Sequence, residues 1–117
     1  MKILEKQFAF SRLIVELIEE AYRRGYTLTL GEAWRSPETA AIYAKQGKGI
    51  KNSLHIQRLA LDINLYRKDI WLKKTEDYEG LGLYWESLGT PGLETAWGGR
   101  FSKPDGCHFS LIHNGTK

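Results

Sequence analysis

Cysteine and histidine are both scarce in this sequence, and each scarcity limits the chemistry open to the protein. A single cysteine, Cys107, excludes an internal disulfide, which agrees with synthesis in a reducing compartment. Only three histidines are present, so a site that depends on imidazole has few possible forms. No apolar run is long enough to span a bilayer. Glutamates interrupt the apolar pattern near the N-terminus, so we expect no secretory signal.

Long basic runs and interleaved aromatic ladders are also missing, although the net charge is +3 and the pI is near 9.0. Scattered lysines and arginines are typical of a solvated surface, so nucleic-acid binding is a weak interpretation. A mildly basic surface suits an anionic partner such as a cell-wall polymer. The 117 residues, 42% of them hydrophobic, predict one domain over 1–117 with a modest core, and we expect a monomer.

Two helices are predicted in the first half of the chain. Apolar residues recur at three- and four-residue spacing over 8–24, and Gly25 is placed to end that helix. A second helix is expected over 37–46. Ser36 has the chemistry of an N-cap, and Pro37 is typical of a first helical turn.

The other expected elements are shorter. A third helix is predicted over 75–88 with Thr75 as its cap, although Gly82 weakens that prediction. Short extended segments are expected at 26–30, 96–97 and 107–112. This mixture of helices and short strands indicates an α+β fold, in which helices pack on a small, largely antiparallel sheet.

The clearest strand covers 59–66. Leucine and isoleucine occupy alternate positions, and Asp62 lies on the opposite face with alanine, asparagine and tyrosine. A carboxylate within a strong strand needs a partner or solvent. Asp62 is therefore either a ligand or a solvent-facing residue of a half-exposed sheet.

Two imidazoles and one carboxylate, from His55, Asp62 and His108, form a plausible zinc set with a fourth position left for water. Asp105 lies three residues before His108, in a turn where its carboxylate is placed to act as a general base. Each residue also has a structural interpretation. A lone loop histidine is often only hydrogen-bonded, and an aspartate before glycine is commonly a turn residue.

Three further residues have candidate roles. Arg35, at a junction of strand and helix, is available to stabilise an oxyanion, or it pairs with a surface carboxylate such as Glu32 or Glu38. Cys107 is considered as a ligand or nucleophile. If 107–110 is a strand, however, its side chain points away from His108 and into the core. His113, near the C-terminus, is expected at the surface.

Four short segments along the chain form an ordered set of sequence motifs. Residues 34–36 read W-R-S, residues 53–62 read S-L-H-I-Q-R-L-A-L-D, residues 97–101 read W-G-G-R-F and residues 105–109 read D-G-C-H-F. They resemble the upstream arginine, the S-x-H-x(6)-D signature, the W-G-G-x-[WF] segment and the D-x-x-H segment of the M15 family of zinc peptidases. That family contains D-Ala-D-Ala carboxypeptidases and L-alanyl-D-glutamate endopeptidases.

The resemblance implies a hedgehog/DD-peptidase-like fold with Zn2+ on His55, Asp62 and His108. It also implies that Asp105 is the catalytic base, and that Arg35 polarises the scissile carbonyl or stabilises the oxyanion.

The same resemblance implies substrate contacts. Ser53 is a candidate substrate-binding hydroxyl or a hydroxyl that supports the ligands, and Trp97 is a candidate substrate-binding residue. Many relatives have a glutamine five residues after the arginine, where this chain has Ala40, so recognition through that position differs here.

The expected function is hydrolysis of an amide bond in the peptide stem of peptidoglycan, with the L-alanyl-D-glutamate bond favoured over D-Ala-D-Ala. Short members of the family without a signal peptide resemble phage endolysins. We therefore expect the protein in the host cytoplasm, reaching the wall when a holin opens the membrane. The alternative is a non-catalytic, zinc-stabilised wall-binding or assembly module. Asp105 and Arg35 argue against it, because a structural zinc needs neither.

Overall fold

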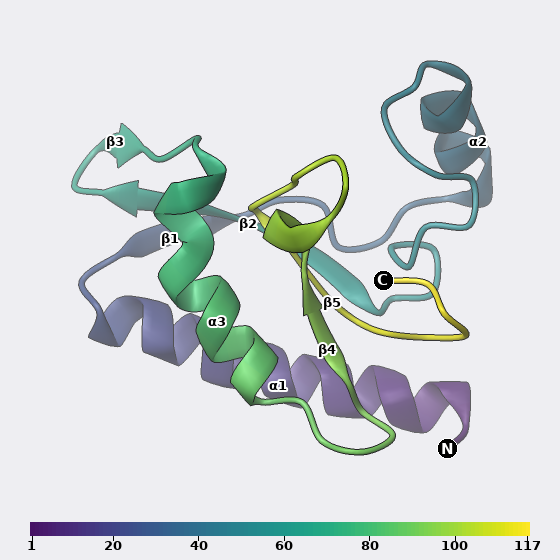
Figure 1. The fold of residues 1–117 in the computed structure, drawn as a ribbon, viewed down its shortest axis with the longest axis horizontal. Helices are drawn as coiled ribbons and strands as arrows, with labels where there is room; N and C mark the ends of the chain where they lie inside the picture. Colours follow the sequence, from purple (N-terminus) through teal and green to yellow (C-terminus); the bar gives the residue numbers. More distant parts are fainter.

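A long N-terminal helix, α1 (Ile3–Arg23), packs along one side of the molecule (Figure 1). The structure is a computed structural model that describes residues 1–117. The inward stripe of α1, formed by Phe10, Ile14, Leu17 and Ala21, is buried in the core. The helix ends as predicted, since Gly25 adopts a φ of +88°. It begins at Ile3, five residues before the predicted start, because its first turn is exposed and so lies outside the apolar repeat.

The second helix, α2 (Pro37–Lys45), confirms the capping prediction. The Ser36 hydroxyl accepts a hydrogen bond from the Thr39 backbone N–H at 3.0 Å. Gly47 follows the helix with a φ of +70°. Figure 1 shows α2 at one end of the molecule, apart from the other two helices.

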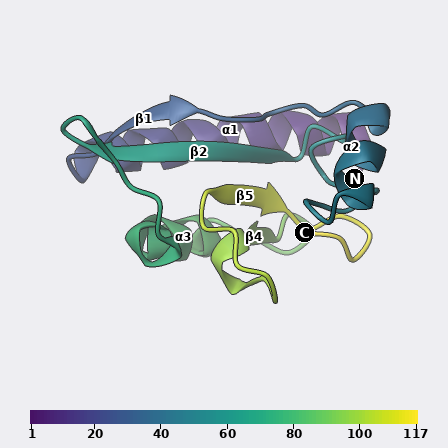
Figure 2. The same ribbon diagram turned by 90° about the horizontal axis from the view of Figure 1, so that it is seen from above.

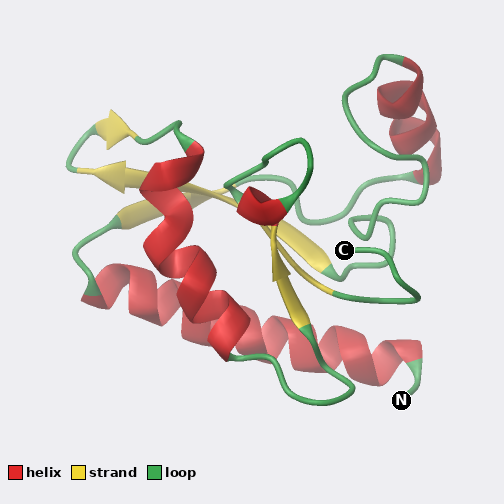
Figure 3. Ribbon diagram, viewed as in Figure 1, coloured by secondary structure: helices red, strands yellow, loops and turns green.

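The predicted third helix is divided in two. A 3-10 turn, η1 (Thr75–Tyr78), leads into the α-helix α3 (Glu79–Ser87) (Figure 3). Thr75 is not the cap. The Asp77 carboxylate instead accepts a hydrogen bond from the Lys74 backbone N–H at 3.2 Å, which tightens the first turn. None of the helices has the length and apolarity needed to cross a bilayer.

Five antiparallel strands form the sheet, which confirms the α+β prediction. Along the sheet the order is β1-β2-β5-β4, and the short β3 pairs with the end of β2. The strands are β1 (Thr27–Leu30), β2 (Ala60–Arg67), β3 (Ile70–Trp71), β4 (Thr95–Trp97) and β5 (His108–Leu111). The long strand β2 is therefore central, and it pairs with β5 at the end that carries Asp62.

The core lies between the helices and the leucine face of β2. Figure 2 shows α1, β1 and β2 on one side of the molecule and α3 with β4 on the other, with β5 between them. Trp85 of α3 is fully buried there, and its ring contacts Phe10 and Phe109 edge-on. Its indole N–H donates to the backbone carbonyls of Ala96 and Ser110, which ties α3 to both β4 and β5.

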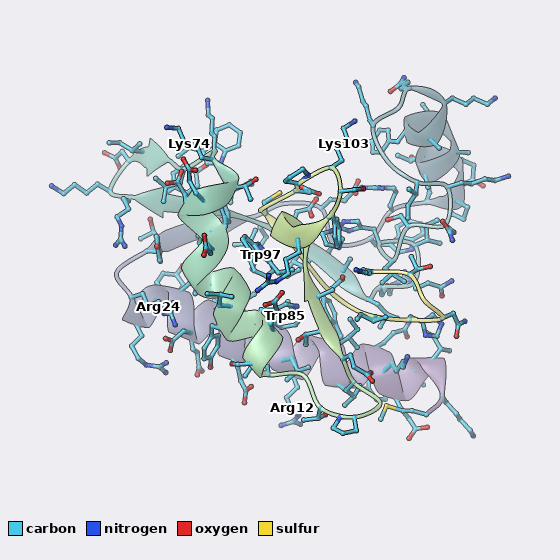
Figure 4. The ribbon with its side chains drawn as sticks, viewed as in Figure 1. Arg12, Arg24, Lys74, Trp85, Trp97 and Lys103 are labelled. Atoms are coloured by element: carbon cyan, nitrogen blue, oxygen red, sulfur yellow. The ribbon has the colours of Figure 1, made fainter.

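A close contact between α3 and β4 explains the glycine that interrupts the helix pattern. A Cβ atom at Gly82 would lie 2.1 Å from the Trp97 ring, so only glycine allows the helix to approach so closely (Figure 4). Trp97 is buried against this position. The residue that weakened the helix prediction is therefore needed for the packing of the helix.

We expect Gly82→Ala to lower the free energy of unfolding by about 1–3 kcal/mol, the usual cost of an overpacked contact. Gly80→Ala in the same helix is the matched control, because a Cβ there meets only the end of the Arg24 side chain. That control should be neutral or stabilising by up to about 1 kcal/mol. Urea denaturation measures both changes. Equal stability of the two variants would contradict the account of this contact.

Candidate metal centre

The pairing of β2 with β5 brings the first two site residues together. Asp62 and His108 are direct partners in the antiparallel register, so their side chains leave the same face of the sheet. The Oδ1 atom of Asp62 lies 3.7 Å from Nδ1 of His108. The β2 alternation predicted from the sequence is confirmed, with Leu61, Ile63 and Leu65 buried on the other face.

The third residue, His55, lies in the tight loop before β2 and is 3% exposed. The Ser53 hydroxyl accepts a hydrogen bond from the His55 backbone N–H at 3.2 Å, which holds the loop. The ring Nδ1 lies 3.2 Å from the Ala33 carbonyl oxygen and donates to it in the neutral tautomer. Nε2 therefore keeps its lone pair and lies 3.4 Å from Oδ1 of Asp62.

Two atoms of this cluster are buried without a hydrogen-bond partner, namely Oδ1 of Asp62 and Nε2 of His108. A buried polar atom left unsatisfied costs about 1–3 kcal/mol, which a bound cation would relieve. One ligand atom from each of His55, Asp62 and His108 lies within 4.8 Å of the others. Two imidazoles and a carboxylate at this spacing fit a zinc ion with a coordination position left open.

The charge state of Asp62 suits a cation. Burial raises the pKa of this carboxyl, but the neighbouring imidazoles of His108 and His55 outweigh burial and hold the pKa at about 2. The carboxylate is therefore ionised at neutral pH, which is the form that binds a metal.

A second group of possible ligands shares Asp62. Ligand atoms of Asp62, Asp105 and Cys107 also lie within 4.8 Å of one another. Burial raises the pKa of the Cys107 thiol to about 12, and the nearby carboxylates of Asp105 and Asp62 add to the shift. The histidine cluster is the better site, because it contains two buried atoms without a partner, whereas the Cys107 thiol already donates to Asp105.

The expectation for Cys107 is corrected in part. Its side chain packs against the core, as expected, but its thiol also donates to Oδ1 of Asp105 at 3.4 Å. The expectation assumed that the strand included residue 107, whereas β5 begins at His108. The turn before the strand, closed by His108 N–H to Asp105 carbonyl at 3.1 Å, allows Cys107 to face Asp105.

Asp105 is exposed beside the buried cluster. Its backbone N–H donates to the Gly98 carbonyl at 2.9 Å. A Cβ atom at Gly98 would lie 2.2 Å from the Asp105 carbonyl oxygen, so glycine is required for this approach. The W-G-G segment therefore holds the turn that carries the carboxylate close to Asp62.

A cleft of about 800 Å³ opens over the cluster and is lined by Arg35, Ser53, His55, Asp105 and His108. Most of the candidate site residues predicted from the sequence therefore line one cleft. The buried histidines lie on its wall, whereas Asp105 is accessible to solvent. An exposed carboxylate next to buried ligands is the arrangement expected of a base that works on a water molecule.

Arg35 pairs with Glu32, as considered from the sequence, whereas its role as an oxyanion stabiliser stays a prediction. Its guanidinium lines the cleft, stacks 4.9 Å from the Tyr43 ring centre and donates from Nε to Glu32 at 2.6 Å. Glu32 also lies 4.0 Å from Nδ1 of His55. This glutamate thus adjoins both Arg35 and a candidate metal ligand, and the sequence indicated it only as a possible ion-pair partner.

Ser53 and Trp97, the two candidate substrate-binding residues, both make contacts that support the backbone of the site. Trp97 does not line the cleft. It is buried, and its indole N–H donates to the Gly106 carbonyl at 2.8 Å, which supports the turn after Asp105. Ser53 lines the cleft, but it is buried and engaged with the His55 backbone. Ala40 is fully buried in α2 and does not line the cleft.

His113, expected at the surface, is half-buried. The chain after β5 returns to α1, where the His113 Nδ1 lies 3.1 Å from Nζ of Lys6. It does not line the cleft. Two of the three histidines are therefore at the candidate metal centre.

The sequence matches one known family. Residues 46–111, more than half of the chain, match the M15 peptidase family described as D-alanyl-D-alanine carboxypeptidase. No curated protein sequence matches the chain.

Two solved structures have a similar fold. The L-Ala D-Glu endopeptidase ChiX of Serratia marcescens matches with a TM-score of 0.68 at 22% identity, over 86% of this chain and 78% of that one. A mutant of the vancomycin resistance D,D-pentapeptidase VanY, from a VanB-type cassette and in complex with Zn(II), matches with a TM-score of 0.57 at 16% identity, over 90% of this chain and 71% of that one. These similarities confirm the predicted DD-peptidase-like fold.

The raised pKa of Cys107 predicts slow alkylation. Because folding raises the pKa of this thiol from 9.0 to about 12, the folded protein keeps the thiol protonated at a pH where the unfolded chain has lost the proton. The contribution of the protonated thiol to folding stability is complete below pH 9 and is lost as the pH rises toward 12. At pH 8 we expect metal-free folded protein to react with iodoacetamide about two to three orders of magnitude more slowly than urea-unfolded protein. Mass spectrometry measures both rates. Equal rates would mean that the thiol ionises freely beside Asp105.

Proposed function

Because the chain belongs to the M15 family of zinc peptidases, in the group described as D-alanyl-D-alanine carboxypeptidases, we propose that it hydrolyses an amide bond in the peptide stem of peptidoglycan. The observation that carries the proposal is the pair of unpartnered buried atoms, on Asp62 and His108, beside the exposed carboxylate of Asp105. Ligands that are buried next to an accessible base favour catalysis over a purely structural ion.

His55, Asp62 and His108 would hold the metal. Zinc bound there supplies the Lewis acidity that activates water and polarises a carbonyl at neutral pH. The backbone and side-chain contacts of the three residues fix their donor atoms before a metal binds. The Ala33 carbonyl sets the tautomer of His55, and the strand register sets Asp62 against His108.

Asp105 is the proposed general base. It takes a proton from the water that forms the new C–O bond and returns that proton to the amine nitrogen as the C–N bond breaks. Its position in the cleft, within 4.8 Å of Asp62, supports this role. Its main chain is held by Gly98 and His108, so the carboxylate does not need to be reorganised for each turnover.

Arg35 is the proposed oxyanion stabiliser. Its charge is permanent, and its guanidinium has five N–H donors, of which Glu32 engages only part. Glu32 and the Tyr43 ring hold the guanidinium at the cleft wall, where negative charge develops on the carbonyl oxygen.

The bond that we favour joins L-alanine to D-glutamate, since the structure matched with the higher TM-score is an L-Ala D-Glu endopeptidase. The family description and the D,D-pentapeptidase support the alternative, removal of a terminal D-alanine. A non-catalytic module that binds the wall is the third possibility. The accessible Asp105 and the open cleft count against it.

We also propose an endolysin-like setting, in which the enzyme reaches the wall from the host cytoplasm when a holin opens the membrane. The net charge of +3 supports association with an anionic wall.

The decisive experiment is a digest of purified sacculi followed by mass spectrometry of the muropeptides. We expect stem peptides with a new amine on D-glutamate. A chelator should abolish their release and added zinc should restore it. Asp105→Asn should keep stoichiometric zinc but lose activity by about 10²–10⁴-fold, the usual contribution of a general base. Asp69→Asn, at an exposed turn, is the matched control and should remain active.

Other products have defined meanings in this digest. Release of free D-alanine would show that the enzyme is a carboxypeptidase and not an endopeptidase. Full activity of metal-stripped protein would contradict the metal mechanism. Binding to sacculi without any new termini would favour the non-catalytic module.

A further inference from the structure

The cleft over the metal centre has more positive charge than the proposed hydrolysis requires. Five cationic side chains line it, against the single carboxylate of Asp105. Arg35 is paired with Glu32, and Arg100 with Glu86. The other three cations are lysines, and none of them forms an ion pair with a carboxylate; they are Lys48, Lys103 and Lys117.

Two of these lysines line the cleft from separate loops that contact each other. Lys48 belongs to the loop after α2, and Lys103 to the loop between η2 (Gly98–Arg100) and β5. The Lys103 ammonium donates to the carbonyl of Gly47 at 3.1 Å, and Gly47 directly precedes Lys48. Figure 4 shows Lys103 extending from its loop toward the loop that follows α2.

An anionic ligand would suit this arrangement. Two lysines that line the same cleft, with no acidic side chain paired to either, create a positive potential there that favours a bound anion. Amide hydrolysis by Asp105 and Arg35 does not use them. They are therefore available for a charged group of the substrate that lies beside the scissile bond.

We propose that Lys48 and Lys103 bind a carboxylate next to the scissile amide, so that the enzyme selects stems in which this carboxylate is free over stems in which it is amidated. This inference rests on the proposed function. In a stem cut between L-alanine and D-glutamate, the group is the α-carboxylate of D-glutamate, because the peptide continues through the γ-carboxyl. In a stem cut before D-alanine, it is the terminal carboxylate.

The test compares two synthetic stem peptides that differ only in this group, a carboxylate in one and a carboxamide in the other. The wild-type zinc enzyme should have a lower KM for the carboxylate peptide. Lys48→Gln and Lys103→Gln should each raise that KM about threefold to fivefold, as expected for exposed ion pairs, with kcat nearly unchanged. Neither variant should change the KM of the carboxamide peptide. Added salt should weaken only the carboxylate preference.

Two further variants separate charge from structure. Lys51→Gln is the matched control, because Lys51 is exposed on the same loop but does not line the cleft. It should leave both KM values unchanged. Lys103→Arg keeps the charge and should keep the preference, even if the contact with Gly47 changes.

A binding measurement distinguishes failure of this inference from failure of the proposed function. Calorimetry on zinc-loaded Asp105→Asn protein should give tighter binding of the carboxylate peptide, and Lys48→Gln in that background should remove the difference. Equal binding and equal cleavage of the two peptides would overturn the inference while leaving the hydrolysis intact. If neither peptide is cleaved, the proposed function fails, and the calorimetric preference alone then supports or overturns the carboxylate site.

Discussion

The antiparallel pairing of β2 with β5 is the constraint on which the rest of the site depends. It places Asp62 directly opposite His108, while Leu61 and Phe109 on the other face are buried in the core. A slip of one residue in either strand would turn the carboxylate or the imidazole into that core, at a large desolvation cost. The packing of the core therefore also fixes the positions of two proposed metal ligands.

The remaining parts of the site are attached to this pair by backbone contacts. The Gly31 N–H donates to the Asp62 carbonyl and the Asp62 N–H donates to the Glu32 carbonyl, so the chain before α2 runs beside the ligand strand. Gly98 holds the turn of Asp105, and Trp97 supports it through Gly106. The result is asymmetric. The two histidines proposed as ligands are buried and held in place, whereas Asp105, the proposed base, is exposed to the cleft, as the proposed hydrolysis of a peptide requires.

Sequence patterns predicted the parts of the structure that depend on local chemistry. The alternation in β2 gave the correct face for Asp62, and the Ser36 cap gave the start of α2. Long-range contacts were not predictable in this way. The tryptophan of the W-G-G segment is buried against α3, because Gly82 leaves room for its ring. Cys107 contacts Asp105 because the strand starts one residue later than its pattern indicates. Lys48 and Lys103 are ordinary loop lysines in the sequence, and only the fold brings the two loops together.

The central claim is that zinc is bound by His55, Asp62 and His108 and not by the neighbouring group that contains Cys107. Zinc K-edge X-ray absorption of the loaded protein tests this claim most directly. The account predicts a first shell of nitrogen and oxygen at about 2.0–2.2 Å with imidazole scattering, and loss of stoichiometric zinc in His108→Ala. A sulfur scatterer at about 2.3 Å, or full zinc content in His108→Ala, would contradict it.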